Sequence, residues 1–275
     1  TGLNDLQVVY GNLQGSGEIQ STNITVNYGT FQMSGTLLGT PRLSVYYGSL
    51  DPAGSAAIAT TDTGDLVLNS AILLLQLNSD VAYDQVNVTG TVQLSDGYPQ
   101  LDLDYHPNIG QQFTIINNDG SDPVQGTFGY KEGSLIFAGT DTFQISYVGG
   151  TGNDVTLTRV MADIWSGGAG AGDTNWSTAA NWLGDVAPTA GDFLIFPDLT
   201  TQTIATNDYT SGMGFGGIMV VGNAYVLAGN SIVLNGLENR GASNTLDLPI
   251  VLGDSLSLVN SGGDLKTSAI DLNGH

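Results

Sequence analysis

The sequence predicts an all-β protein built mainly as a parallel β-solenoid. Short runs alternate apolar and polar residues and are separated by very short turns, the pattern of half-buried strands. The chain has 39 glycines but only five Lys and Arg residues, so good helix formers are scarce. Asn-Gly turns are few, with Asn235-Gly236 and Asn273-Gly274 the clear ones, which favours coiling over hairpins. A β-sandwich is the alternative, because no strict period is visible.

The first hundred residues carry the clearest strand rhythm. We expect strands and tight turns in "LQVVYGNL", "NITVNYGTFQM", "RLSVYYGSL", "LVLNSAILLLQL" and "VNVTGTVQL". In a solenoid, each rung buries its inward residues against the rungs on either side, with strands about 4.8 Å apart. These runs are therefore predicted to be successive rungs of one array.

Residues 101–160 have longer loops and more aromatic residues. They are expected to form a compact cap of antiparallel strands with its own aromatic core. The aromatic residues expected in this core are Phe113, Phe128, Phe137, Phe143 and Tyr147. A domain boundary is predicted near residue 160, giving domains at 1–160 and 161–275.

The second domain opens with a Gly- and Ala-rich segment, residues 161–190, which holds all three tryptophans. The strand rhythm returns from residue 191 with "FLIFPDL" and continues to the Asn273-Gly274 turn. We expect an uncapped array end at His275, which exposes a template for a further strand or another molecule.

The charge is strongly acidic. The formal net charge is -21, from 26 acidic and five basic residues. Such a charge repels nucleic acid and anionic lipid, which both need a basic surface. It suits divalent cations and an aqueous exterior. No stretch reaches the roughly 20 apolar residues of a membrane span, and there is no cysteine.

Several stretches of the sequence resemble a known bacterial family. "YDQVNVTGTVQL", "GQQFTIINNDGSDPVQGTF" and "EGSLIFAGTDTFQISYVGGTGNDVTLT" resemble the closing unit of surface proteins with autotransporter-associated (passenger-associated transport) β-strand repeats. "WSGGAGAGDTNWSTAANWLGDVAPTAGDFLIFP" is similar to the opening unit of the next array, and "AGNSIVLNG" and "LDLPIVLGDSLSLVNSGGDL" to its first rungs. The resemblance covers roughly residues 50 to 275. It implies a large, secreted or surface-anchored β-helical protein, typical of planctomycetes, with an adhesive or structural role and no catalytic residues.

The stretch "YVGGTGNDVTLT" is a candidate calcium nonapeptide. Its glycines and Asp154 fit the G-G-x-G-x-D-x-U-x pattern, but the apolar position falls on Thr156. Only one copy is present, whereas a calcium roll needs stacked copies. The stretch is therefore interpreted first as a tight turn before a strand, with Asp154 kept as a candidate calcium ligand.

A second candidate calcium site is the loop "NNDGSDP". Asn117, Asp119 and Asp122 offer oxygens at near-alternate positions, as calcium loops do. The spacing of an EF-hand is absent, so an Asx turn is the alternative. No cofactor is required by the sequence, and calcium is the one considered.

Three tryptophans and three sequons are the candidate binding and modification residues. Trp165, Trp176 and Trp182 are expected to plug the end of the second array, with a sugar-stacking platform as the alternative. The sequons at Asn23, Asn87 and Asn175 are candidate glycosylation sites if the protein is exported.

The sequence predicts that the protein is not an enzyme. Asp102 and Asp104 alternate on one side of an expected strand, with His106 two residues on. Paired carboxylates can perform acid–base work, but here a solvent-facing strand is favoured. Two histidines cannot form a zinc triad, and no nucleophile-elbow, P-loop or dinucleotide-binding pattern occurs. A β-helical glycoside hydrolase is a less favoured alternative.

These observations predict a secreted structural protein at the cell surface, a subunit of an extracellular filament or layer. Its main partner would be other copies of itself, joined end to end by strand addition or stacking. A monomeric adhesin that binds surface glycans is the alternative. Neither nucleic acid nor membrane insertion is expected.

Overall fold

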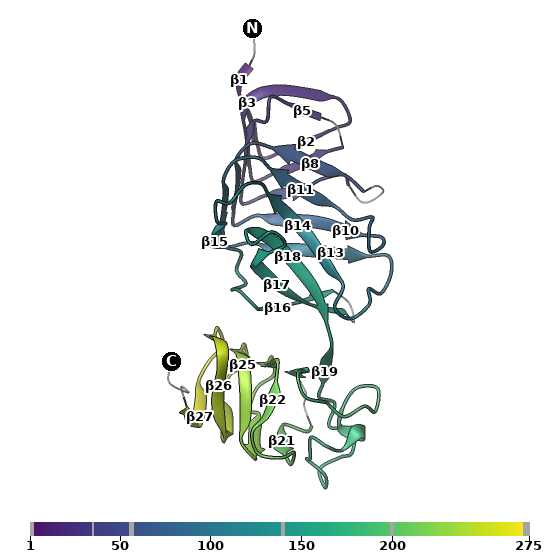
Figure 1. Cartoon of the computed structure of the whole chain (residues 1–275), viewed down its shortest axis with the longest axis vertical. Helices are drawn as coiled ribbons and strands as arrows, with labels where there is room; N and C mark the ends of the chain where they lie inside the picture. The colour runs from purple at the N-terminus through teal and green to yellow at the C-terminus, as the bar shows by residue number, and fades with distance from the viewer. Residues whose placement is uncertain (1–2, 35, 55–57, 139–140, 199–200, 272–275) are drawn as a thin grey trace. The chain divides into compact units, whose positions relative to one another are not determined.

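The computed structural model describes residues 3–34, 36–54, 58–138, 141–198 and 201–271. It confirms the all-β solenoid, since nearly all neighbouring strands pair in parallel (Figure 1). The chain divides into two compact units, Thr1–Arg159 and Val160–His275. The Asn273-Gly274 turn and the array end at His275 lie outside the described residues.

The first unit winds through three sheets in turn. One sheet, here called the A sheet, contains β1 (Leu3–Val9), β3 (Glu18–Asn27), β6 (Arg42–Tyr46), β9 (Leu66–Asn69), β12 (Val92–Ser95) and β15 (Gln125–Thr127), with β5 (Thr36–Leu38) beside β3. The second contains β2 (Asn12–Gly15), β4 (Thr30–Met33), β7 (Ser49–Asp51), β10 (Ile72–Leu77) and β13 (Tyr98–Leu103). The third contains β8 (Thr60–Thr63), β11 (Gln85–Val88) and β14 (Gln112–Asn118).

The alternating sequence produces this architecture because the strands stack in register. Ile24, Leu43, Leu66 and Val92 form one inward column across β3, β6, β9 and β12. All four side chains are completely buried. Burying such a side chain contributes about 1.5–3 kcal/mol, so repeated columns of this kind hold the rungs together.

One corner of the first unit carries a ladder of stacked tyrosines. Tyr10, Tyr28 and Tyr47 each have a φ between 53° and 56°, a conformation that is rare for a bulky residue. Their ring centroids lie 5.1 and 5.2 Å apart, with nearly parallel planes. A glycine follows each tyrosine, and a Cβ on Gly29 would overlap the Gly11 carbonyl oxygen of the next rung. Glycine is therefore required where the rungs approach most closely.

The expected antiparallel cap is present at the end of the first unit. β18 (Asp154–Val160) pairs antiparallel with β14, and β16 (Leu135–Ala138) pairs antiparallel with β17 (Asp141–Gly149). The prediction of a separate aromatic core was wrong, because Phe113, Phe128, Phe143 and Tyr147 belong to the same continuous core as the rungs. Phe137 lies outside that core and is 39% exposed, because neighbours along a strand point to opposite faces.

The second unit is built from one mostly parallel set of nine strands. They are β19 (Ala162–Ile164), β20 (Phe193–Phe196), β21 (Ile204–Asn207), β22 (Met213–Phe215), β23 (Gly217–Val220), β24 (Val226–Gly229), β25 (Ile232–Asn239), β26 (Asn244–Asn260) and β27 (Leu265–Asp271). A single 3-10 turn, η1 (Ala179–Asn181), interrupts the loop before β20. Among the described residues, no helix is long and apolar enough to cross a membrane.

We expect Gly29→Ala to destabilise the first unit by about 1–3 kcal/mol, because the added methyl group forces the stacked rungs apart. Gly17→Ala is the matched control, since a Cβ there meets no atom within 4 Å. Hydrogen exchange of peptides from β3 and β6 measures the effect. Equal protection in the two variants would contradict the close-approach argument.

Candidate functional site

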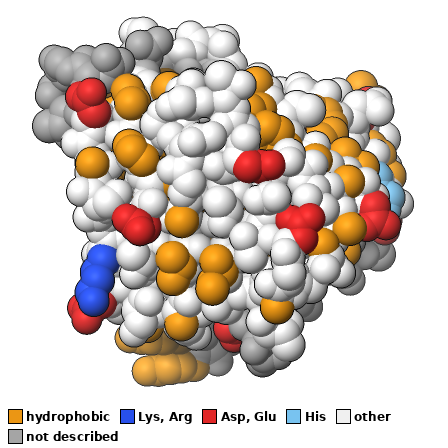
Figure 2. Space-filling model, turned by 90° about the horizontal axis from the view of Figure 1, so that it is seen from below, with side chains coloured by type: hydrophobic (Ala, Val, Ile, Leu, Met, Phe, Trp, Pro, Cys, Tyr) orange, Lys and Arg blue, Asp and Glu red, His pale blue; other side chains and the backbone are white. Residues whose placement is uncertain are grey.

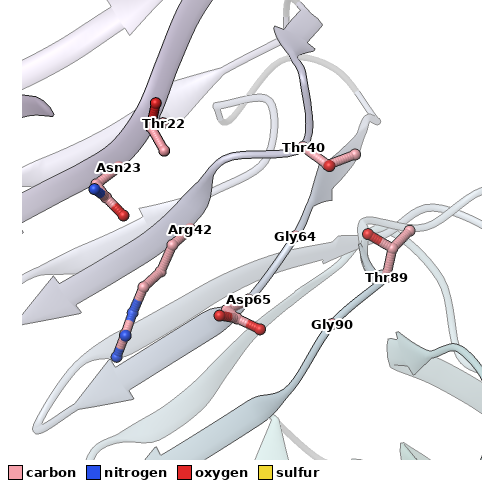
Figure 3. A pocket seen from close by; sticks show the side chains of 8 residues that line it. All are labelled: Thr22, Asn23, Thr40, Arg42, Gly64, Asp65, Thr89 and Gly90. Atoms are coloured by element: carbon pink, nitrogen blue, oxygen red, sulfur yellow. The ribbon is translucent and has the colours of Figure 1, made fainter. Parts of the chain in front are cut away.

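The strongest candidate site is a polar groove on the A sheet of the first unit. It has a volume of about 490 Å³. Its walls come from the middle of β3, the start of β6 and the turns that precede β6, β9 and β12. The lining residues are Thr22, Asn23, Thr40, Arg42, Gly64, Asp65, Thr89 and Gly90 (Figure 3). We call this cavity the Arg42 groove.

Parallel stacking creates the polar column that forms the centre of the groove. Asn23 pairs with Arg42 in register, and Asp65 directly precedes Leu66, the partner of Leu43. Arg42 therefore lies between an amide and a carboxylate, as Figure 3 shows. The amide of Asn23 also donates to the Asp5 carboxylate at 2.6 Å, so the column continues to β1.

Asp65 is held as an ionised acceptor. Its Oδ1 accepts hydrogen bonds from the Thr91 backbone N–H at 2.8 Å and from the Thr91 hydroxyl at 3.0 Å. The backbone hydrogen bond from Thr91 is the main reason that the pKa of Asp65 lies below its ordinary value, and Arg42 lowers this pKa further. Partial burial opposes these effects but does not reverse them.

The backbone of the groove is tightly constrained. Thr40 has a φ of 47°, which is a strained value for a β-branched residue. A Cβ on Gly64 would overlap the Thr40 carbonyl oxygen, and one on Gly90 would overlap the Asp65 carboxylate. Larger residues at either glycine would therefore change the groove.

Asp154, a predicted calcium ligand, accepts hydrogen bonds from protein groups through both of its carboxylate oxygens. Its Oδ1 accepts from the Asn118 backbone N–H at 2.8 Å. Its Oδ2 accepts from the Thr151 backbone N–H at 2.8 Å and hydroxyl at 3.1 Å. Asp154 thus joins the turn after β17 to the end of β14, which fits the tight-turn interpretation of this stretch.

The other predicted calcium ligands also take part in hydrogen bonds with protein groups. Asn117 takes part in an exposed amide ladder, donating to the Asn87 side chain at 3.0 Å. The backbone carbonyls of Asp119 and Asp122 accept from the Asn153 side chain at 3.3 and 3.1 Å. No group of three or more His, Cys, Asp or Glu side chains suited to a metal occurs in the described residues. Calcium binding stays a prediction.

The three tryptophans lie in the core of the second unit. Trp165, Trp176 and Trp182 are at most 1% exposed. Trp182 packs edge to face on Trp165 and Trp176, and all three rings pack against Phe196. Their indole N–H groups at 165 and 182 donate to the carbonyls of Gln202 and Trp176. Their ring faces are therefore covered by protein rather than open to a sugar.

The three sequon asparagines differ in their surroundings. Asn23 and Asn87 donate their side-chain N–H groups to Asp5 and Asp62, at 2.6 and 2.8 Å. Asn175 is exposed on a loop, and its side chain makes no hydrogen bond to the described residues. Of the three, Asn175 has the amide best placed for modification.

His106 has a partner that the sequence did not reveal. Its Nδ1 lies 2.7 Å from Oδ2 of the buried Asp141, whose Oδ1 is 2.7 Å from Arg159 Nη2. Asp102 and Asp104 are exposed on the same side of the chain and line a cavity of about 490 Å³ with His106. Asp141 is 35 residues from His106, and no local signal marks the pair.

The second unit contains a buried carboxylate, Asp163, that no pattern in the sequence indicated. Asp163 lies on β19, where it pairs in register with the core residue Leu194 of β20. It is 9% exposed. Burial, with a further contribution from the neighbouring Asp192 carboxylate, raises the pKa of Asp163 to about 7. One Asp163 oxygen has no hydrogen-bond partner among the described residues.

Comparisons with known proteins give no assignment. No protein-family model, no curated protein and no solved structure matches the chain. The resemblance to autotransporter-associated repeat proteins therefore stays a prediction from the sequence.

We expect the second unit to lose stability as the pH rises from 5 to 8. The folded pKa of Asp163, about 7, exceeds its unfolded value of about 4. The folded state therefore binds more protons between these values, and stability present at low pH is lost as the carboxyl ionises. The loss is at most about 1.4 kcal/mol per pH unit. Tryptophan fluorescence measures it, since all three tryptophans report on this unit.

Asp163→Asn should flatten this dependence and raise the unfolding midpoint at pH 8. Asp185→Asn makes the same chemical change at an exposed position and should leave the dependence intact. If the stability of Asp163→Asn changes with pH as that of the parent chain does, Asp163 does not control the pH dependence.

Proposed function

We propose that this protein is a secreted structural scaffold whose solenoid units assemble end to end into an extracellular filament or layer. The observation that carries the proposal is the partial burial of the inward side chains on the first described rung of the first unit. Leu6, Val8 and Leu13 occupy inward positions but are only partly buried. Their partners in the next rung, such as Ile24 and Val26, are completely buried.

A further rung would complete this end. Among the described residues β1 pairs only with β3, and β2 only with β4, so the backbone groups on the other edge of each strand face no partner strand within that part of the chain. An added parallel strand satisfies these groups and covers the inward side chains. Tyr10, the first residue of the tyrosine ladder, is 78% exposed.

The last strand of the second unit offers a complementary edge. Within the residues that the structure describes, β27 pairs only with β26, and its Leu265 and Ile270 are only partly buried against the core. A contact between unlike ends repeats without closing, so it generates a fibre.

The surface supports an extended, soluble assembly. Acidic side chains are scattered singly over the face seen in Figure 2, rather than gathered into a patch. With a formal net charge of -21, finished fibres repel one another, which limits lateral bundling.

We expect the unaltered chain to show concentration-dependent association in sedimentation velocity, and Val8→Lys to abolish it, because a charge at an inward position cannot be buried. Gln7→Lys, the matched control, adds the same charge on the outward face of β1 and should leave association intact. Ile270→Lys should block the opposite end.

Mixing the two blocked variants gives the sharper test. Val8→Lys keeps a working β27 edge and Ile270→Lys keeps a working β1 edge, so an equimolar mixture should form discrete dimers and nothing larger. A parent chain that stays monomeric at high concentration, or a mixture that stays monomeric beside a polymerising parent, would overturn head-to-tail assembly.

A further inference from the structure

We propose that the Arg42 groove binds a neutral, hydroxyl-rich polysaccharide. This inference is independent of end-to-end assembly, because the groove lies on the outer side of the A sheet rather than at a rung edge. Its volume of about 490 Å³ is within the range of small-ligand clefts, about 300–1,000 Å³.

The chemistry of the lining matches sugar hydroxyls. Thr22, Thr40 and Thr89 contribute hydroxyl groups and Asn23 an amide. Each hydroxyl both donates and accepts hydrogen bonds, as do the hydroxyls of a sugar. Thr22 and Thr40 are exposed and, within the part of the chain that the structure describes, their side chains make no hydrogen bond. They are therefore available to a ligand.

Arg42 and Asp65 supply a paired donor and acceptor. Across the described residues the Arg42 side chain makes no hydrogen bond and no ion pair, and it acts on Asp65 through its charge alone. Asp65 Oδ1 is taken by Thr91, and no hydrogen bond to Oδ2 occurs within the same residues. A guanidinium beside a carboxylate oxygen can donate to one hydroxyl of a vicinal diol and accept from the next.

The charge of the site favours a neutral ligand. One cation and one ionised carboxylate balance each other within the groove, so no local excess of positive charge remains. The chain as a whole has a net charge of -21, which repels a polyanion such as a polyuronate.

The groove is rigid before any ligand arrives. Thr40 has a φ of 47° and its neighbour Gly39 a φ of 79°. Strained backbone of this kind persists only where the surrounding structure holds it in place. Gly64 and Gly90 allow the walls to approach closely. Pre-organisation of this kind reduces the entropy lost on binding.

A second cavity on the same sheet indicates a polymer rather than a single sugar. It has a volume of about 300 Å³ and lies over β9, β12 and β15. Its polar lining includes Asn69, Gln93, Ser95 and Gln125. Both cavities include the β9 and β12 rungs of the A sheet, so a chain laid over these strands can contact both.

The test is a titration of the full chain with soluble xyloglucan, galactomannan and dextran as neutral probes, and with polygalacturonate and alginate as acidic ones. Isothermal titration calorimetry should show binding to at least one neutral probe. Arg42→Ala should weaken it about tenfold or more, the loss expected for a charge-assisted hydrogen bond. Arg42→Lys, which keeps the charge but not the planar fork, should weaken it as well.

Lys131→Ala is the matched control, because it removes an exposed cation that lies outside the groove. It should bind like the parent chain. An unchanged circular dichroism spectrum shows that each variant is folded, and Thr40→Ala tests the groove without altering charge. Binding that survives Arg42→Ala and Thr40→Ala, or no binding to any neutral probe, would overturn the site. Binding to polygalacturonate or alginate alone would overturn the neutral class.

Discussion

The structure depends on the registered stacking of inward side chains from one rung to the next. Ile24, Leu43, Leu66 and Val92 occupy one column, and a slip of one residue would turn each of them to the outside. Register is therefore fixed by burial, and the backbone hydrogen bonds between rungs follow from it. Every outward column is placed as a consequence, including the one that holds Arg42 between Asn23 and Asp65.

Outward columns make polar features that no single rung contains. The tyrosine ladder, the Asn117–Asn87–Asp62 chain of side-chain hydrogen bonds and the Arg42 groove each need several turns of the solenoid. Tight corners with glycine bring these turns close together. A solenoid of this kind offers two separate surfaces, rung edges that suit self-assembly and sheet faces that suit a long ligand.

Buried carboxylates explain part of the difference between the expected and the observed sites. Asp84 is completely buried and accepts hydrogen bonds from the backbone N–H groups of Ala59 and Gln76, at 2.8 and 2.9 Å. The buried carboxylates of Asp141 and Asp154 also have protein partners, the Arg159 side chain and the Asn118 backbone N–H. The sequence presents all of these residues as ordinary acidic turn residues, so acidity alone does not separate structural carboxylates from candidate ligands.

The sequence by itself determined the all-β class, the parallel solenoid, the antiparallel cap and the boundary region near residue 160, because period-two alternation and turn residues act locally. Only the tertiary structure decided that the cap aromatics join the main core, that His106 meets Asp141 and that Arg42 faces Asp65 across a groove. These pairings join residues that are far apart in the sequence. Because the rungs differ in length, the spacing of residues along the chain does not reveal which of them pair in register. The physical reason is that burial of whole columns, rather than any local preference, sets which residues become neighbours.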